Sequence, residues 1–186
     1  GLLWSGRGVS QLLSAGAALS YGPFSAAVAP EVTWSENRAF DIVPNGRPGE
    51  LRYGNPHYGD DAIDLPQRFG TGPFATWGPG QSYVRVDRWN AALGISSENL
   101  WLGPGIRSSI LMSSAGPGFP HVFLGTSRPG DIWIGKAEAL LFWGQLRRTR
   151  FIAGGGKPLV SGLAVGYEPR WISGLHVGLG RVFIQP

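Results

Sequence analysis

The sequence is constrained most by a strict alternation of apolar residues with small or polar ones. Between positions 24 and 35, one set of alternate residues is mostly apolar: Phe24, Ala26, Val28, Pro30, Val32 and Trp34. The other set is small or polar: Ser25, Ala27, Ala29, Glu31, Thr33 and Ser35. Successive side chains of a β-strand point to opposite faces of a sheet, so this period of two predicts a strand. Because Pro30 has no N–H to donate, we expect a bulge or kink at that position.

The same pattern recurs along the chain, with turn residues between the segments. An earlier run over residues 9–21 is joined to Phe24 through Gly22 and Pro23, and another turn is predicted near Trp89 and Asn90. Further alternating segments begin at Gln81, Leu93, Asp131, Leu159 and Leu175. Since neighbouring segments form hairpins, we expect an all-β fold with about eight to ten strands in an antiparallel up-and-down meander.

The composition agrees with strands and excludes several other classes. The chain has 186 residues, of which 30 are Gly and 15 are Pro, so helix is not expected to dominate. Its 8 Trp, 9 Phe and 5 Tyr are too many for a disordered chain. The absence of Cys excludes disulfides and thiol chemistry. There is no apolar run of about eighteen residues, which excludes a spanning helix but leaves open a spanning β-barrel, whose strands need only about 9–11 residues.

Alternation alone leaves two architectures open. In a soluble sandwich the apolar face would contact a core, whereas in an outer-membrane barrel it would contact lipid and the polar face would line the lumen. The long strands, the aromatic residues near strand ends (Trp34, Trp89, Tyr167 and Trp171) and the small residues on the polar face favour the barrel.

Two irregular regions, at about residues 37–80 and 97–130, interrupt the strands. The second is rich in Gly-Pro turns and also carries many large apolar side chains: Trp101, Leu102, Ile110, Leu111, Met112, Phe119 and Phe123. Long loops in compact folds are usually functional or disordered, and this loop is too apolar to be a free linker. We therefore expect an ordered loop that packs into or across the barrel.

Motifs for catalysis and metal binding are weak. The run Gly154-Gly155-Gly156-Lys157 is followed by Pro158 and lacks the Ser or Thr of a phosphate-binding loop. A cation site is disfavoured because Asp60, Asp61 and Asp64 match no known ligand loop, and because His57, His121 and His176 are widely separated. Glu98 with a distant Asp is a formal glycosidase pair, but any chain with twelve acidic residues offers such pairs. We expect no catalytic residues, metal or cofactor, and hence no enzyme.

Binding chemistry is better supported. The net charge of +4 comes almost entirely from Arg, whose planar fork pairs with carboxylates and stacks on aromatic rings. We expect Trp77, Trp101, Arg107 and Arg128 to lie in loops rich in Gly and Pro, and aromatic faces stack on sugar rings. These four residues are the candidate site for an acidic glycan. The alternative is that the same side chains simply plug the loop onto the barrel wall.

The chain resembles the Wzi family of bacterial capsule-assembly proteins. The most specific motif is SENLWLGPG at residues 97–105, and IDLPQRFG at residues 63–70 also matches. The matching pieces cover nearly the whole chain in the expected order: 29–31, 37, 63–70, 80–83, 97–105, 108–113, 118–129, 142–146 and 174–182.

This resemblance implies a lectin-like protein of the bacterial outer membrane that anchors polysaccharide to the cell surface. The partners it implies are an acidic capsular polysaccharide or exopolysaccharide and outer-membrane lipid, with no nucleic acid. Family members are porin-sized barrels, so residues 1–186 are expected to be one partial barrel domain, a fragment of a larger barrel that is monomeric when complete. A pore for small solutes and, more weakly, a glycan-processing enzyme remain as alternatives.

Overall fold

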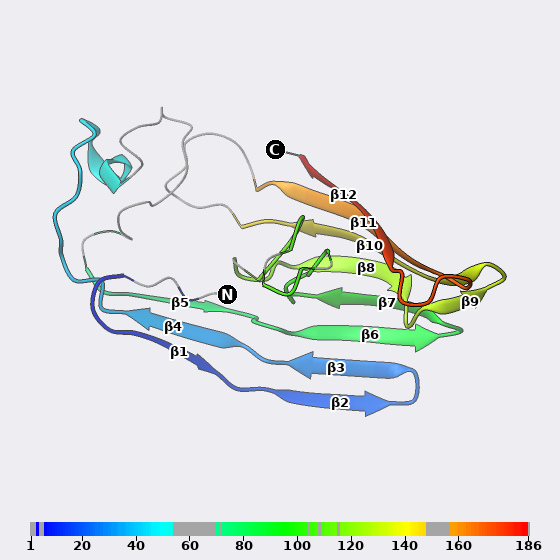
Figure 1. The fold of residues 1–186 in the computed structure, drawn as a ribbon. Helices are drawn as coiled ribbons and strands as arrows, with labels where there is room; N and C mark the ends of the chain where they lie inside the picture. Colours follow the sequence, from blue (N-terminus) through cyan, green and yellow to red (C-terminus); the bar gives the residue numbers. More distant parts are fainter. Residues whose placement is uncertain are drawn as a thin grey trace.

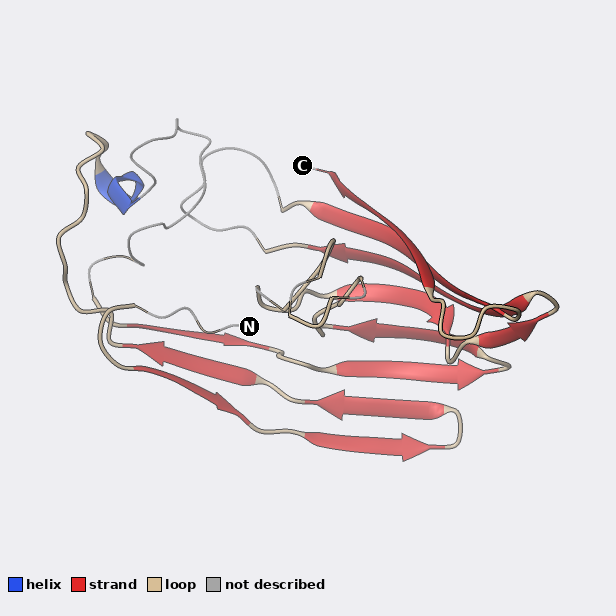
Figure 2. Ribbon diagram, in the orientation of Figure 1, coloured by secondary structure: helices blue, strands red, loops and turns tan. Residues whose placement is uncertain are grey.

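The computed structural model describes residues 3, 6–53, 70, 72–103, 105–107, 109–114, 116–147 and 157–185. Its regular structure is almost entirely antiparallel β-strand, with one 3-10 helix, η1 (Gly49–Tyr53) (Figure 2). The all-β antiparallel fold expected from the alternation is therefore confirmed. Among the described residues, no helix has the length and apolarity needed to cross a membrane.

Most strands belong to one large sheet, a meander in which chain neighbours usually pair (Figure 1). Its strands run in the spatial order β12–β11–β10–β8–β7–β6–β3–β2, and β9 pairs with β10. Their bounds are β2 (Ala17–Tyr21), β3 (Phe24–Val28), β6 (Tyr83–Arg88), β7 (Ala91–Ser96), β8 (His121–Thr126), β9 (Gly130–Ile132), β10 (Gly135–Gln145), β11 (Leu159–Pro169) and β12 (Val177–Gln185).

A small sheet continues three of these strands beyond a shared break. It contains β1 (Ser10–Ser14), β4 (Glu31–Ser35) and β5 (Phe74–Gly78) in the order β1–β4–β5. Figure 1 shows β1, β4 and β5 in line with β2, β3 and β6. The interruption expected at Pro30 is confirmed, and it is larger than a bulge, since it divides the segment into β3 and β4.

The break is closed by a serine and by close backbone contact. Ala29 forms an isolated bridge with Gly80, and a Cβ on Gly80 would lie 2.1 Å from the Ala29 carbonyl oxygen. The Ser82 hydroxyl accepts from the Ala29 N–H at 2.9 Å and donates to the Pro79 carbonyl at 2.5 Å. Backbone groups that lose ladder partners at the break thus gain a side-chain partner.

The two loops predicted from the sequence are longer than the loops in the structure. The region 37–80 contains β5, and the region 97–130 contains β8, so the second loop ends before His121. The described residues form 12 strands rather than eight to ten, because two predicted long strands each divide at the break and because β5 and β8 lie in regions predicted to be loops. Six-residue strands such as β8, bounded by Gly and Pro, resemble loop in composition.

The register of the large sheet makes one face mostly apolar, and we call it the bare face. One row across it consists of Tyr21, Phe24, Val86, Leu93, Leu124, Leu141, Leu163 and Arg181. The next row consists of Leu19, Ala26, Val84, Ile95, Val122, Trp143, Ser161 and Phe183. Many of these side chains are exposed, including Leu19 at 72% and Ile95 at 59%.

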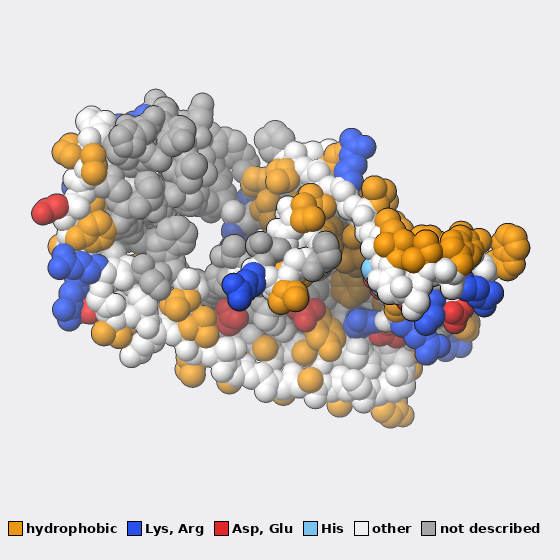
Figure 3. Space-filling view, viewed as in Figure 1, with side chains coloured by type: hydrophobic (Ala, Val, Ile, Leu, Met, Phe, Trp, Pro, Cys, Tyr) orange, Lys and Arg blue, Asp and Glu red, His pale blue; other side chains and the backbone are white. Residues whose placement is uncertain are grey.

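The opposite face, which we call the covered face, is small and polar toward β2. The row between the two bare-face rows consists of Ser20, Ser25, Arg85, Gly94, Phe123, Phe142, Gly162 and Val182. Figure 3 looks onto this face, where the segment that follows β7 lies over the strands. The hydrophobic core forms at that contact: Leu102 and Phe119 from the segment pack with Phe142 and Val160 from the sheet.

The position of the core predicts that substitutions on the two faces of β10 change stability by different amounts. Phe142 is fully buried, so Phe142→Ala should lower the free energy of unfolding by about 3–5 kcal/mol through lost contacts and a cavity. Its neighbour Trp143 lies on the bare face, and Trp143→Phe should change the free energy by less than about 1 kcal/mol. Urea unfolding measures both free energies. Equal losses would show that the core does not lie at this contact.

Candidate functional site

The central loop, residues 97–120, joins β7 to β8 and closes on itself at its base. A Cβ built on Gly118 would lie 1.8 Å from the Ser97 carbonyl oxygen, so only glycine fits where the returning chain meets Ser97. The loop is thereby an Ω-type excursion with a tight neck. Its shape follows from this contact rather than from a regular element.

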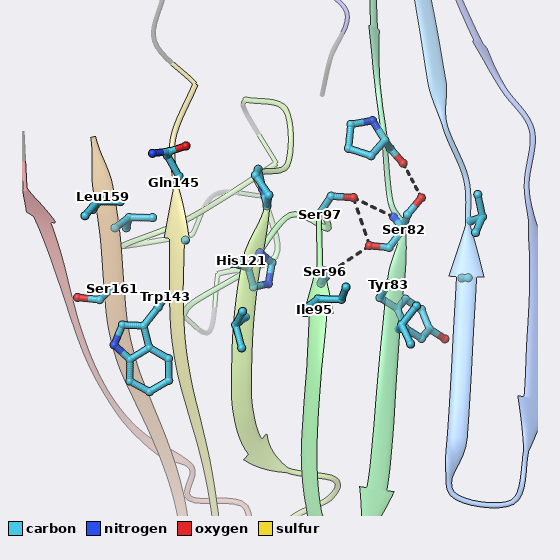
Figure 4. A pocket seen from close by; sticks show the side chains of 18 of the residues that line it. Ser82, Tyr83, Ile95, Ser96, Ser97, His121, Trp143, Gln145, Leu159 and Ser161 are labelled. Atoms are coloured by element: carbon cyan, nitrogen blue, oxygen red, sulfur yellow. Dashed lines mark hydrogen bonds between the residues drawn. The ribbon is translucent and has the colours of Figure 1, made fainter. Parts of the chain in front are cut away.

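Hydrogen bonds of serine residues connect the neck of the loop to the neighbouring strand break at residues 79–82. The Ser97 N–H donates to the Ser82 carbonyl at 2.8 Å, and the Ser97 hydroxyl donates to the Gly80 carbonyl at 2.8 Å. The Ser96 hydroxyl also reaches the Ser82 carbonyl, at 3.3 Å. Figure 4 shows the serine contacts among Ser82, Ser96 and Ser97. The loop base and the break at residues 79–82 therefore form one hydrogen-bonded unit.

Asn99 fixes the first turn of the loop. Its N–H donates to the Gln81 side-chain oxygen at 3.1 Å, and the Gln81 amide donates back to the Asn99 side-chain oxygen at 2.8 Å. The Asn99 amide also donates to the carbonyls of Gly116 at 2.9 Å and Ser113 at 3.4 Å. One asparagine thus links both arms of the loop to Gln81, at the strand break before β6.

The loop has an apolar underside and an exposed upper side. Leu102 bridges to Met112, is buried, and reaches the Phe142 cluster. Trp101, next to it, is 40% exposed and donates its indole N–H to the Gly105 carbonyl at 2.8 Å. Arg107 is exposed, as is Ile106 beside it. The contact that plugs the loop onto the sheet is therefore made by Leu102, while Trp101 and Arg107 remain accessible.

The other two candidate glycan residues lie elsewhere. Trp77 is in β5, where it pairs with Val32 on an exposed face of the small sheet, and is not in a loop. Arg128 lies in the turn between β8 and β9, at the end of the sheet opposite the central loop (Figure 1). Of the four candidates, Trp101 and Arg107 share the central loop, where the Trp101 indole bonds the carbonyl of Gly105, two residues before Arg107.

A shallow hollow of about 880 Å³ lies on the bare face, behind the central loop (Figure 4). Its wall is apolar, formed by side chains such as Val84, Ile95, Val122 and Trp143. Its polar groups, among them Ser82, Ser97 and Gln145, lie toward the end at which the central loop leaves the sheet. The sequence did not predict this hollow. Its wall forms only when residues of four separate strands become neighbours, and that depends on the register of the sheet.

Ser96, Glu98 and His121 lie close together, but they do not form a catalytic triad. Ser96 pairs with His121 across β7 and β8, yet its hydroxyl donates to Glu98 at 3.1 Å. The Nδ1 of His121 donates to the Phe119 carbonyl at 2.8 Å. A triad needs the histidine to accept the proton of the serine and to be oriented by a carboxylate. These contacts instead hold the loop base in place.

Metal chemistry gains no support. Within the described ranges, no three His, Asp or Glu side chains are grouped so as to hold a metal ion. His57, Asp60, Asp61, Asp64 and the glycine run 154–156 lie outside those ranges.

Comparisons of the chain with protein-family models, with curated proteins and with solved structures found no match. The relation to the Wzi family stays a prediction that rests on the sequence motifs.

The Asn99 contacts predict how firmly the loop is held. Asn99→Ala removes three side-chain hydrogen bonds worth about 1 kcal/mol each, so tryptic cleavage after Arg107 should become at least about tenfold faster. Gln145→Ala, which removes an exposed amide from the bare face, is the matched control and should leave cleavage unchanged. An unchanged rate in Asn99→Ala would mean that other contacts hold the loop.

Proposed function

We propose that this chain forms part of a bacterial outer-membrane β-barrel that holds acidic polysaccharide at the cell surface. The observation that carries the membrane assignment is the bare face, with its exposed apolar rows across eight strands. The polysaccharide assignment is supported by the resemblance to the Wzi family and by the exposed Trp101 and Arg107.

Exposure of the apolar bare face to water would be energetically unfavourable. Burial of apolar surface is worth about 25 cal/mol per Å², and no second layer covers this face in the described part of the chain. A sandwich would need a second sheet packed there. Strand length agrees with lipid, since β10 and β11 each have eleven residues and a tilted transmembrane strand needs about 9–11.

The two ends of the sheet differ as they do in outer-membrane barrels. Short turns join β2 to β3 at Gly22-Pro23 and β6 to β7 at Trp89-Asn90, whereas the opposite end carries the long connections 36–73 and 97–120. In bacterial barrels the short turns are periplasmic and the long loops extracellular. The central loop would therefore face the outside of the cell.

The central loop favours an anchor over an open pore. It packs on the covered face, which would line the lumen, and its apolar underside is part of the core. A closed barrel also needs strands beyond β2 and β12, because unpaired backbone groups in lipid cost several kcal/mol each. Such strands would complete a monomeric barrel around the loop.

Trp101 and Arg107 provide suitable chemistry for an acidic sugar. The ring of Trp101 offers a flat face for stacking, and the guanidinium of Arg107 can pair with a sugar carboxylate. Arg107 makes no ion pair with any acidic residue in the described ranges, so its charge is available.

The two faces of edge strand β2 provide a direct test of membrane contact. Leu19 is on the bare face and its neighbour Ser20 on the covered face, and both are exposed. Leu19→Arg would place a charge in lipid and should lower stability in phosphatidylcholine vesicles by about 2–4 kcal/mol, whereas Ser20→Arg should cost less than about 1 kcal/mol. Urea titration of the vesicle-bound protein measures both. Equal, small effects would contradict the membrane assignment.

Substitution of one arginine at each end of the sheet tests whether the central loop binds polysaccharide. In cells that carry the whole gene, Arg107→Ala should reduce the polysaccharide retained at the surface several-fold, since one charge-assisted pair contributes about 1.5–3 kcal/mol. Arg128→Ala is the control and should retain the wild-type amount. If both variants retain it fully, Arg107 is not a polysaccharide ligand.

A further inference from the structure

Hydrogen bonds link neighbouring hairpin turns along the end of the sheet opposite the central loop, which we call the rim. The Asp87 N–H donates to the Pro23 carbonyl at 2.8 Å, and the Ser127 N–H donates to the Asn90 carbonyl at 3.0 Å. The Arg170 N–H donates to the Ile134 carbonyl at 3.1 Å. These turns therefore lie side by side along one end of the sheet, on the right in Figure 1.

Large aromatic side chains project from this rim. Trp89 is 88% exposed, Trp133 is 89% exposed and Trp171 is 68% exposed. Trp89 also adopts a positive φ of 50°, a conformation unfavourable for a bulky residue. An exposed tryptophan held in a strained turn indicates a surface role, because it contributes little to the core.

Each of these tryptophans has an arginine at the same rim. Arg88 precedes Trp89, with its guanidinium 4.5 Å from the ring centre, and Arg170 precedes Trp171. Arg128 lies in the turn between β8 and β9, a few residues before Trp133. We call these six residues the turn-end belt. All six side chains are exposed.

The acidic residues at this end do not neutralise the belt. Asp87 is held by Arg85 and by the Ser127 hydroxyl. Asp131 and Glu168 are the register partners of Lys136 on either side of β10. Within the described ranges, no carboxylate lies within ion-pair distance of Arg88, Arg128 or Arg170. In the part of the chain that the structure describes, these three guanidinium groups therefore have no acidic partner.

We propose that the turn-end belt binds the phosphate groups of anionic phospholipids. This inference rests on the proposed membrane function. The belt follows the turn end of the bare face: Arg88 and Trp89 come directly after the row that contains Val86 and Leu93, and on β10 and β11 two more rows intervene before Trp133 and Trp171. Its tryptophans would therefore lie at the boundary between acyl chains and headgroups. Arginine forks next to that boundary match lipid phosphate in charge and geometry. Arg128 is thereby assigned to lipid rather than to polysaccharide.

Vesicles of two compositions test the proposal. The protein expressed from the whole gene is refolded from urea in the presence of phosphatidylcholine vesicles, or of vesicles with equimolar phosphatidylcholine and phosphatidylglycerol, and the bound fraction is measured by flotation. Each basic residue near an anionic surface is worth about fivefold in binding, so the wild type should prefer the anionic vesicles by roughly 100-fold. The triple variant Arg88→Gln, Arg128→Gln and Arg170→Gln should lose this preference and bind both vesicles alike.

A second triple variant controls for net charge. Arg7→Gln, Arg47→Gln and Lys157→Gln remove the same charge from residues outside the belt and should keep most of the preference. If this control loses as much as the belt variant, or if the wild type binds both vesicles equally, the belt is not a lipid-phosphate site and the membrane function stands. If the wild type binds neither vesicle, the proposed membrane function fails as well.

Discussion

The structure depends on the antiparallel register that brings the alternating residues of eight strands into common rows. Because each strand has a period of two, a fixed register sends Leu93, Leu124 and Leu141 to one face and Gly94, Phe123 and Phe142 to the other. A slip of one residue in any strand would reverse its faces. The apolar face that results is uncovered in the described part of the chain, and this single property leads to the membrane assignment.

The covered face obtains its core from a loop rather than from a second sheet. Leu102 and Phe119 close over Phe142 and Val160, while the neck at Ser97 and Gly118 and the Asn99–Gln81 pair fix the position of the loop. The exposed side of the same loop presents Trp101 and Arg107. Adjacent residues of the loop therefore have different roles: Leu102 packs against the sheet, and Trp101 remains exposed. The loop can thus be held rigidly and still offer side chains for binding.

The sequence predicted those parts of the fold that depend on local pattern. The faces of β6, β7 and β11, the turn at Trp89-Asn90 and the interruption at Pro30 follow from alternation and turn chemistry. The grouping of site residues does not, because it depends on topology: Trp77 was assigned to a loop and lies in β5, and Arg128 shares the 97–130 region with Arg107 but lies at the other end of the sheet. The intervening β8 separates them, and its six residues resembled loop in composition.

The central claim, that the bare face contacts hydrocarbon, is tested most directly by spin labels on β2, since the chain has no Cys to interfere. Single cysteines at positions 17 to 21 would be labelled in vesicle-bound protein, and collisions with oxygen and with a water-soluble nickel chelate would be measured. Labels at 17, 19 and 21 should favour oxygen, and labels at 18 and 20 should favour the chelate. Equal access of the chelate to all five positions would contradict the claim.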